Sequence, residues 1–477
     1  MKRTKIVCTI GPASDKKPIL KKLIRNGLNV ARLNFSHGTH SAHLKVIKNI
    51  RSVANELNQS IAILLDLQGP RIRLGDLPEK GIELKKGQEV ILTTDTAFQN
   101  GKIPVTYEKM HEDVAAGQRV LIADGIINLL IKKVRGKEMV CEVVNGGTVT
   151  SHKGMNLPDT NVTVPSLSVK DKEDLLFGIK NDVDYVALSF VRTAKEVYEL
   201  KDLIEKYEKK LKIKNVSPVK VIVKIERKEA IDNIDEIVKA TDAVMVARGD
   251  LGIELPAEDV PLMQKMLIDK CLEAAKPVIV ATQMLESMIT NPRPTRAEIS
   301  DVANAVIDHT DAIMLSGETA VGKFPAEAVD YMKKTVVKTE KSAYDDLSLQ
   351  EKTKKIVPTS EAIGSVAKML SMHVDAKLIL IGSITGNSAR LVSRYRPELP
   401  ILVACEDDRV KRQLSLTWGA IPFVLPPCKT IEKLIGMGIN YLKENKFAKK
   451  GDQIIIVGGS PVGRSGQLNL VEIIKID

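Results

Sequence analysis

Short apolar runs recur along most of the chain and alternate with stretches of helical, amphipathic pattern. Most of the runs are continuous rather than alternating, which is typical of parallel strands buried on both faces. Most gaps between them are roughly 20–30 residues, enough for a crossover helix. Eight β–α units predict an α/β fold built on a closed (β/α)8 barrel. The runs are 5–10, 29–33, 61–65, 184–189, 219–225, 243–247, 277–282 and 312–315.

The gap between the third and fourth runs is far longer than the others. Within it, residues 70–166 contain short β-type pieces punctuated by glycine, such as 89–92, 119–122 and 139–143. This pattern predicts a small antiparallel β domain, a β-barrel inserted after the third strand. An insertion on that loop would lie over the C-terminal face of the barrel, where active sites form, so we interpret it as a lid.

A third region follows a polar, charged linker after about residue 342. Strand patterns near 377–381, 400–404, 422–425 and 453–457 alternate with helical patterns, which predicts a smaller, open α/β domain. The predicted division is therefore a catalytic barrel from 1–69 and 167–341, a lid from 70–166, and a C-terminal regulatory domain from 342–477.

The predicted barrel strands end in polar segments: 31–38, 66–73, 224–226, 247–252, 281–283 and 316–319. One such end alone reads as an ordinary capped turn, because Ser, Asn, Asp and Gly are common there. Six polar ends on one rim argue against that bland reading, since function collects at the C-terminal strand ends of such barrels.

The end of the fifth strand is the clearest candidate for a functional site, because Lys224 and Glu226 lie on the same face there. They form either a solvated ion pair or a site in which the glutamate holds a metal and the lysine an anion. Glu226 and Asp250 end adjacent strands, about 4.8 Å apart in a sheet, and two such carboxylates suit a hard divalent cation. Lys224 and Arg32 would supply fixed positive charge for a phosphoryl group.

Other rim residues extend this picture to a second substrate. Arg73 and His37 are candidates to hold another phosphate-bearing molecule, and Gly249 lets the backbone approach a ligand closely. The pattern fits phosphoryl transfer, where catalysis is mainly positioning and charge neutralisation. The sequence has neither a Gly-x-x-x-x-Gly-Lys-[Ser/Thr] loop nor the protein-kinase motif set, so nucleotide binding must be of another kind.

Charge and composition narrow the class of protein. The 71 basic and 60 acidic residues give a formal charge of +11, but aromatic residues are only 3%, too few for a convincing stacking surface for nucleic acid. We therefore assign the excess charge to substrate phosphates. The five cysteines are scattered without a Cys-x-x-Cys pair, and no apolar run is long enough to span a bilayer. We expect a cytoplasmic protein without membrane or nucleic-acid partners.

Seven stretches of the sequence resemble the pyruvate kinase family, in its three-domain bacterial form, over essentially the full length of the chain. They are 4–12, 31–38, 219–231, 245–254, 281–288, 292–304 and 314–320. The resemblance implies a homotetramer that transfers the phosphoryl group of phosphoenolpyruvate to ADP, giving pyruvate and ATP. It also implies a barrel, a lid-like β domain and a C-terminal effector domain in the places that the periodicity predicts.

The same resemblance implies roles at the rim. Arg32 would bind the substrate phosphate, and Lys224 would stabilise the transferring phosphoryl group. Glu226 and Asp250 would hold Mg²⁺ or Mn²⁺.

The carboxylate and enolate end of phosphoenolpyruvate would contact Gly249, Asp250 and Thr282. Thr282 and Ser316 are candidates to position the water or hydroxyl relay that protonates the enolate.

Two further sets of positions match ligands of the family. The K⁺ ligands match Asn34, Ser36, Asp66 and the carbonyl of Leu67. The contacts to nucleotide phosphates match Asn34, His37, Arg73 and, from the lid, Lys153.

The chain departs from the family pattern next to the K⁺ set. Many members have Thr-Lys-Gly-Pro-Glu where this chain has Leu67-Gln68-Gly69-Pro70-Arg71. A guanidinium near a monovalent-cation site repels the cation by roughly a few kcal/mol at an effective dielectric constant near ~20, and it can replace the cation's charge. We predict activity largely independent of K⁺.

The family places a sugar-phosphate effector in a strand-to-helix loop of the third domain. Here hydroxyl and backbone N–H groups at a helix N-terminus would form a phosphate cradle, with charge from Arg464. Ile384 and Asn387 weaken the case for fructose 1,6-bisphosphate and favour AMP or a monophosphorylated sugar; the alternative is an ordinary helix N-cap without an effector. The candidate residues are Ser383, Thr385, Gly386, Asn387, Ser388 and Arg464.

Two rival functions remain at this point. A metal-dependent barrel aldolase or lyase acting on pyruvate enolate shares the carboxylates and an arginine, but it explains neither Lys224 nor the lid. A basic, non-catalytic nucleic-acid-binding protein would not need six polar strand ends.

Overall fold

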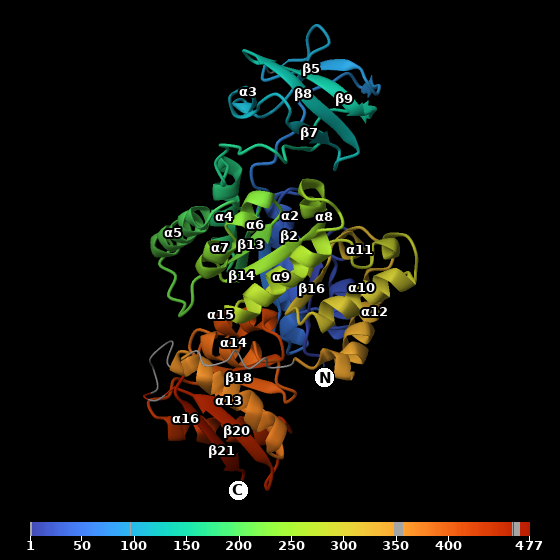
Figure 1. The fold of residues 1–477 in the computed structure, drawn as a ribbon. Coiled ribbons are helices and arrows are strands. Elements are labelled where there is room, and N and C mark those ends of the chain that lie inside the picture. Colours follow the sequence, from blue (N-terminus) through green and yellow to red (C-terminus); the bar gives the residue numbers. More distant parts are fainter. Residues whose placement is uncertain (1, 96, 348–355, 460, 462–467) are drawn as a thin grey trace.

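The computed structural model describes residues 2–95, 97–347, 356–459, 461 and 468–477. Figure 1 shows three parts stacked along one axis, with a β-rich part at the top, a barrel in the middle and an α/β part at the bottom. Within the described residues, no helix is both long and apolar enough to cross a membrane.

The middle part is a closed barrel of eight parallel strands, which confirms the predicted fold class. Its strands are short and almost wholly buried, as their continuous apolar runs predict. They follow one another around the barrel in the order β1-β16-β15-β14-β13-β12-β3-β2. Their bounds are β1 (Lys5–Thr9), β2 (Val30–Asn34), β3 (Ala62–Asp66), β12 (Tyr185–Leu188), β13 (Lys220–Ile225), β14 (Ala243–Ala247), β15 (Val278–Ala281) and β16 (Ala312–Leu315).

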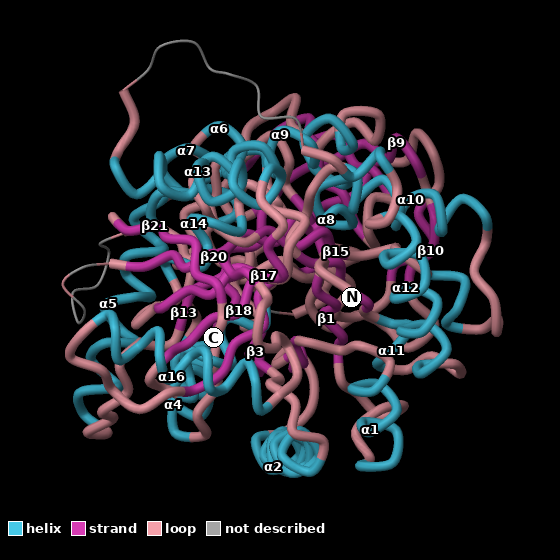
Figure 2. The backbone as a smooth tube through the Cα atoms, turned by 90° about the horizontal axis from the view of Figure 1, so that it is seen from below, coloured by secondary structure: helices cyan, strands magenta, loops and turns pink. Residues whose placement is uncertain are grey.

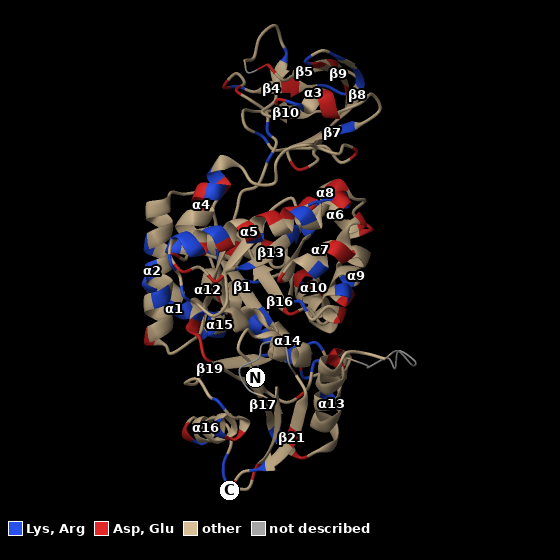
Figure 3. Ribbon diagram, turned by 90° about the vertical axis from the view of Figure 1, so that its left-hand side faces the viewer, with Lys and Arg blue, Asp and Glu red and all other residues tan. Residues whose placement is uncertain are grey.

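A ring of helices covers the outside of the barrel, and the ribbon in Figure 3 marks many Lys, Arg, Asp and Glu positions along these helices. Several begin at side-chain caps: Thr39 accepts from the Ala42 N–H, and Ser168 and Thr295 form capping boxes. The helices are α1 (Lys17–Arg25), α2 (His40–Glu56), α4 (Val169–Lys180), α5 (Ala194–Lys210), α6 (Lys228–Asp232), α7 (Ile234–Ala240), α8 (Arg248–Glu254), α9 (Val260–Glu273), α10 (Arg296–Ile307), α11 (Gly317–Ala320) and α12 (Pro325–Thr339), with short 3₁₀ turns η1 (Glu286–Ile289) and η2 (Ala343–Asp345).

The top part is the insertion between β3 and β12. A six-stranded sheet in the order β11-β7-β8-β9-β5-β6 forms a half-barrel around its own apolar core, beside a two-stranded sheet of β10 and β4. The elements are β4 (Ile82–Leu84), β5 (Glu89–Thr93), β6 (Ile103–Pro104), α3 (Met110–Asp113), β7 (Arg119–Ile122), β8 (Ile127–Arg135), β9 (Glu138–Asn145), β10 (Gly147–Val149) and β11 (Met155–Asn156).

The bottom part is an open five-stranded sheet in the order β19-β18-β17-β20-β21, with helices on both sides. The first four strands are parallel and were predicted; the antiparallel edge strand β21 was not. The elements are α13 (Thr359–His373), β17 (Ala376–Gly382), α14 (Asn387–Ser393), β18 (Ile401–Cys405), α15 (Asp408–Gln413), η3 (Leu414–Leu416), β19 (Ala420–Val424), α16 (Ile431–Glu444), β20 (Gln453–Gly458) and β21 (Leu470–Lys475). The limits predicted for the three domains stay predictions.

The segment from α15 to β19 closes the lower mouth of the barrel. Leu416 is fully buried and belongs to the apolar cluster inside the barrel, together with Val7 and Tyr185. Lys5 of β1 donates to the carbonyl of Ala420 at 2.8 Å. Figure 2 views the molecule from this end, with the C-terminal strands in front. The C-terminal part therefore supplies the floor of the barrel core.

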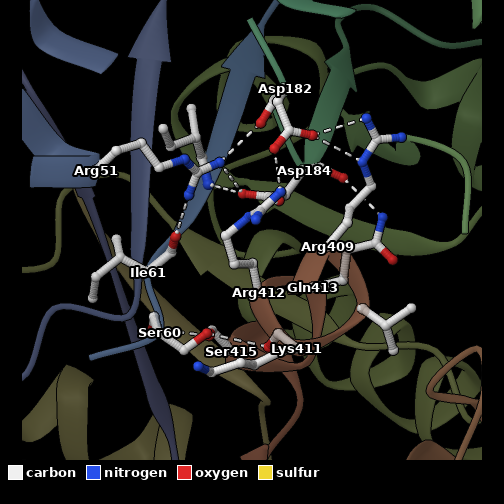
Figure 4. Close-up of polar contacts among 12 residues, drawn as sticks. Arg51, Ser60, Ile61, Asp182, Asp184, Arg409, Lys411, Arg412, Gln413 and Ser415 are labelled. Atoms are coloured by element: carbon white, nitrogen blue, oxygen red, sulfur yellow. Dashed lines mark hydrogen bonds and ion pairs between the residues drawn. The ribbon is translucent and has the colours of Figure 1, made fainter. Parts of the chain in front are cut away.

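A network of ion pairs fixes this floor at its edge (Figure 4). Asp184, at the start of β12, accepts from Arg51 of α2 at 2.8 Å and from Arg412 of α15 at 2.7 Å. Asp182 accepts from Arg409 at 2.9 Å and from Arg412 at 2.6 Å. Because Asp184 and Arg409 are almost fully buried, removing one partner would leave an uncompensated buried charge.

Candidate active site

The upper rim of the barrel brings together charged residues from β2, β3 and β13; β2 and β3 are neighbours, and β12 lies between β3 and β13. Asn34 at the end of β2 lies opposite Asp66 at the end of β3, and Lys224 of β13 lies opposite Met245 of β14. Parallel register places these strand ends at one level. The rim predicted from the pattern is therefore a single cluster of side chains.

Lys224 lies at the centre of this cluster. Its Nζ is 2.7 Å from Glu226 Oε1 and 3.7 Å from Asp66 Oδ1, and it donates to Ser189 Oγ at 3.0 Å. Burial alone would lower the pKa of Lys224, but the charges of Asp66 and Glu226 outweigh it and leave the pKa raised. The lysine therefore stays charged at neutral pH.

Glu226 is buried, with 1% of its surface exposed. Its Oε2 accepts from the backbone N–H of Phe190 at 2.6 Å. Burial raises the pKa of Glu226 to about 7; Lys224 opposes this rise, and the neighbouring charge of Asp250 adds to it. Two neighbouring carboxylates of this kind are suitable ligands for a divalent cation.

Arg32 is fixed beside Lys224 by its own set of partners. Its Nε donates to Asp66 Oδ2 at 2.6 Å, and a second nitrogen donates to Thr9 Oγ1 at 2.8 Å. Asp66 thus contacts both cations, Arg32 and Lys224. Two adjacent, oriented cations form a suitable cradle for one phosphoryl group.

The opposite side of the rim has a strained turn. Thr282 has a φ of +73° and Gln283 a φ of +54°, and the first value is a clear outlier for a β-branched residue. Thr282 Oγ1 accepts from the Gly249 N–H at 2.9 Å, while Arg248 donates to the Thr282 carbonyl at 2.8 Å. The hydroxyl proton of Thr282 is therefore left to donate elsewhere.

Ser316 lies at the start of α11, where its N–H donates to Glu318 Oε2 at 2.7 Å. Its hydroxyl stays a candidate for the proton relay by position at a strand end.

The four predicted K⁺ ligands lie near one another, and three of their oxygens have protein donors. Asn34 Oδ1 accepts from the Ser36 N–H at 3.1 Å, and the Leu67 carbonyl accepts from Ser189 Oγ at 2.8 Å. Asp66 is held by Arg32 and Lys224, as above. The set is rich in positive charge before any monovalent cation binds.

Arg71 extends away from this set toward the lid. Its guanidinium is 4.0 Å from Asp124 Oδ1 and packs against Gly154, both of the inserted part. It also lines a pocket of about 520 Å³ that Asp250 shares. Arg71 thus lies between the inserted part and Asp250.

The proposed nucleotide contacts divide between barrel and lid. Asn34 and the exposed His37 follow β2, whereas Arg73 donates to the His152 carbonyl at 3.0 Å and forms a bridge with Gly154. Lys153 precedes that bridge and is exposed. A groove of about 2110 Å³, lined by Asp124 from the lid side and by Gly249, Asp250 and Thr282, opens beside the rim.

The candidate effector residues lie at the joint between β17 and α14. Ser383 and Ser388 are mostly buried, and Gly386 has a φ of +82°. The Asn387 side chain accepts from Arg390. Arg464 lies outside the described residues.

Comparison with known proteins identifies the family. The family description "Pyruvate kinase, barrel domain" matches residues 1–329, and "Pyruvate kinase, alpha/beta domain" matches residues 361–474. The chain belongs to the pyruvate kinase family. A pyruvate kinase of Geobacillus stearothermophilus is 42% identical over 99% of this chain and 80% of its own length, and one of Staphylococcus aureus (strain MRSA252) is 44% identical with the same coverage. A crystal structure of a pyruvate kinase from Cryptosporidium parvum is 39% identical, with a TM-score of 0.93 over 100% of this chain and 96% of that one.

Membership of the pyruvate kinase family confirms the predicted enzyme class, a phosphotransferase. It also removes the aldolase and nucleic-acid-binding alternatives. Among the described residues, no group of three or more His, Cys, Asp or Glu side chains forms a metal cage.

Sequence reasoning missed two participants in this pyruvate kinase site. Ser189, just after β12, contacts Lys224, the Leu67 carbonyl and, at 3.5 Å, Asp66. Phe190 contributes a backbone N–H to Glu226 with a φ of +55°. The serine that ends the fourth apolar run, 184–189, was the available signal in the sequence.

Proposed function

We propose that this chain transfers the phosphoryl group of phosphoenolpyruvate to ADP, giving pyruvate and ATP, in the cytoplasm. The observation that carries the proposal is the Lys224 ammonium, held between Asp66, Ser189 and Glu226 and beside Arg32. All five cysteines are free and buried, which supports a reducing compartment.

Glu226 and Asp250 would hold Mg²⁺ or Mn²⁺ at the end of adjacent strands. Carboxylate oxygens are the ligands that these ions prefer. Burial raises the pKa of Glu226, and the nearby charge of Asp250 adds to this rise. When bound, the ion neutralises negative charge on the substrate phosphate. Glu226 must lose its proton to act as a ligand.

The protein groups would then act as follows. Arg32 binds the phosphoryl oxygens in a fixed orientation because Asp66 and Thr9 hold its guanidinium. Lys224 Nζ, turned away from Glu226 by substrate, stabilises the charge on the phosphoryl group as it transfers. Gly249, Asp250 and Thr282 would contact the carboxylate and enolate end.

The second half of the reaction adds a proton to the enolate carbon. Thr282 Oγ1 accepts from Gly249 and keeps its own proton for donation or for a bound water. Ser316 supplies a second hydroxyl at the next strand end. We propose these two hydroxyls as the ends of the proton relay.

ADP would bind between the barrel and the lid. Asn34 and His37 approach from the barrel, and Arg73 and Lys153 from the base of the lid, so closing the lid would assemble the nucleotide site and exclude water.

We also propose activity largely independent of K⁺. Pyruvate kinases generally use K⁺, but here the oxygens of Asp66 already contact Arg32 and Lys224, and Arg71 adds a cation at the lid edge. Assays in tetramethylammonium buffer should show nearly full activity. A hundredfold rise in activity on adding KCl would contradict the proposal.

A phosphorylated effector, AMP or a monophosphorylated sugar, is proposed to bind the cradle of Ser383, Thr385, Gly386, Asn387 and Ser388. The cradle would activate the enzyme at subsaturating phosphoenolpyruvate. Titrating AMP and glucose 6-phosphate under that condition tests it, with Ser388→Ala as the variant that should lose the response.

A homotetramer is proposed from the free edge of the C-terminal sheet. β21 is an edge strand, and Ile473 is 40% exposed. On the neighbouring helix α13, Val366, Met369 and Met372 are also exposed. An apolar edge of this kind is a template for pairing with a second copy. Ile473→Lys should shift the mass measured by light scattering to a smaller species.

One coupled assay tests the central proposal. The chain is mixed with phosphoenolpyruvate, ADP and Mg²⁺, and pyruvate is detected with lactate dehydrogenase. Pyruvate formation that requires all three components supports the proposal, and pyruvate formation without ADP contradicts it.

A further inference from the structure

The Lys224 ammonium has three oxygen partners, and one of them has no role in the reaction proposed above. Glu226 would hold the metal, and Asp66 also accepts from Arg32 at 2.6 Å, so each carboxylate has a second cation to contact. The third partner is Ser189 Oγ, which accepts from Lys224 Nζ at 3.0 Å. Ser189 is 1% exposed. Its hydroxyl is therefore a buried partner that the lysine shares with no other cation among the described residues.

The chemistry of its neighbours fixes the direction of the Ser189 hydroxyl. An ammonium only donates hydrogen bonds, and a carbonyl only accepts them. Ser189 Oγ lies 3.0 Å from Lys224 Nζ and 2.8 Å from the Leu67 carbonyl oxygen. Asp66 Oδ1, at 3.5 Å, is beyond the usual range for a hydroxyl donor. The single proton of Ser189 therefore points to the carbonyl, and a lone pair faces the ammonium.

The loop after β3 holds the carbonyl side of this contact in place. A Cβ atom on Gly69 would lie only 2.9 Å from Ser189 Cβ, so the loop backbone packs directly on the serine. The Gly69 N–H donates to Asp171 Oδ1 at 3.1 Å, and the Leu67 N–H donates to the Ala187 carbonyl at 3.2 Å. Ser189 thus has a fixed acceptor on one side and holds the lysine on the other.

The next residue, Phe190, fixes Glu226 from the same strand end. Its backbone N–H donates to Glu226 Oε2 at 2.6 Å, and its φ of +55° is uncommon for a bulky side chain. Such conformations persist where the surroundings over-determine them, and they concentrate at functional sites. Two consecutive residues after β12 therefore hold the lysine by a side chain and the glutamate by a backbone N–H.

We propose that Ser189 is a positioning residue, whose hydroxyl sets the place of the Lys224 ammonium for phosphoryl transfer. This role rests on the function proposed above, and Ser189 needs no contact with substrate to perform it. A hydrogen bond to a charged group changes an equilibrium by about 10–100-fold. Without the hydroxyl, phosphoryl transfer should slow, whereas enolate protonation, assigned to Thr282 and Ser316, should not.

The first test compares turnover in the coupled assay. Ser189→Ala should lower kcat by about 10–100-fold, the effect of losing one such hydrogen bond. The KM for ADP should stay near the wild-type value, because Ser189 bonds to Lys224 and Leu67 and not to the groups proposed to hold ADP. Ser189→Cys, whose thiol is a weak hydrogen-bonding group, should show a loss in the same direction. Circular dichroism checks the fold of both.

A second readout separates positioning from a general disturbance of the rim. Exchange of pyruvate methyl protons with solvent deuterium, followed by NMR with Mg²⁺ present, should stay near the wild-type rate in Ser189→Ala. Adding Ser189→Ala to Lys224→Met should cause no further loss of turnover, because the serine acts through the lysine. Ser217→Ala is the matched control: it removes another buried hydroxyl, just before the opposite end of β13, and both reactions should stay normal.

Three outcomes would overturn this role for Ser189 while leaving the proposed function intact. They are wild-type turnover of Ser189→Ala, an equal slowing of turnover and proton exchange, and a further loss of turnover in the double variant. If Ser189→Ala does not fold, Ser189→Cys decides between the same results. A wild-type chain that forms no pyruvate from phosphoenolpyruvate and ADP would instead overturn the proposed function, and the role of Ser189 with it.

Discussion

Lys224 is both buried and charged, a combination that proteins usually avoid. Asp66 and Glu226 stabilise the charged form of Lys224, because their negative charges outweigh the effect of burial and raise its pKa. The same contacts, together with the hydrogen bond to Ser189, fix the position of the ammonium at the rim.

Replacing Lys224 should therefore separate catalysis from folding. We expect Lys224→Met to lower kcat by at least about 10²–10³-fold, the usual cost of losing one group that stabilises transition-state charge. Coupled assays measure the loss, and circular dichroism checks the fold. Lys209→Met, on the exposed face of α5, is the matched control and should keep normal turnover; normal turnover of Lys224→Met would refute the assignment.

Thr282 offers a test of the proton-transfer half of the reaction. Thr282→Val keeps the β-branched shape at φ +73° but removes the hydroxyl. We expect exchange of pyruvate methyl protons with solvent deuterium, followed by NMR, to slow by about 10²-fold or more. Thr282→Ser retains the hydroxyl and should exchange much faster than the valine variant. Exchange at the wild-type rate in Thr282→Val would remove the threonine from the relay.

Single residues were predictable where charge appeared in an apolar context. Charged residues in or at the ends of buried strands are Lys224, Glu226 and Arg32. Burying a charge costs free energy, so these positions indicated a functional site. Ser189 did not, because a serine after a strand is what an ordinary turn contains. Its role depends on three neighbours that come from β3 and β13, and no local pattern records such neighbours.

Helices and strands were likewise predictable where burial leaves a clear apolar pattern. The barrel strands were found because both faces are buried, which leaves a continuous apolar run. β21 was missed because it is a half-exposed edge strand that follows a glycine-rich stretch, so it carries little apolar signal. The limits of the lid and of the linker stay predictions.

The short element η3 allows a sharp test of how the floor stabilises the barrel. Leu416 is 0% exposed inside the barrel cluster, whereas Leu262 of α9 is 61% exposed. Leu416→Ala should lower the free energy of unfolding by about 2–5 kcal/mol, because it leaves a cavity in a packed core. Leu262→Ala should change it by less than about 0.5 kcal/mol. Urea denaturation of both variants measures the difference, and equal effects would show that Leu416 does not complete the core.

At the scale of the whole molecule, the free energy of unfolding should depend on pH through Lys5. This barrel residue donates to the carbonyl of Ala420 in the C-terminal part. Burial lowers the pKa of Lys5 to about 8, although the charges of Glu340 and Asp311 oppose this; Lys2 is a further cation nearby. A lysine in the unfolded chain titrates near ~10.4, so between pH 8 and that value the unfolded state binds more protons. The contribution of Lys5 to the free energy of unfolding therefore rises with pH in this window.

Comparison with Lys5→Met isolates this contribution. Between pH 7.5 and 10, the wild type should gain about 2–3 kcal/mol of unfolding free energy relative to Lys5→Met. Urea denaturation of both proteins at the two pH values measures it. A constant difference between the proteins would show that Lys5 titrates normally in the folded state.

The position of Leu416 in the chain has a consequence for biosynthesis. β1 lies at residues 5–9, but its neighbour β16 begins at residue 312 and the leucine that fills the barrel floor is residue 416. At about 5–20 residues per second, a ribosome needs roughly 20–80 s to reach that leucine after β1 has emerged. During this interval the inner barrel surface has no complete partner. The barrel core of the nascent chain can therefore be completed only after the ribosome has passed residue 416.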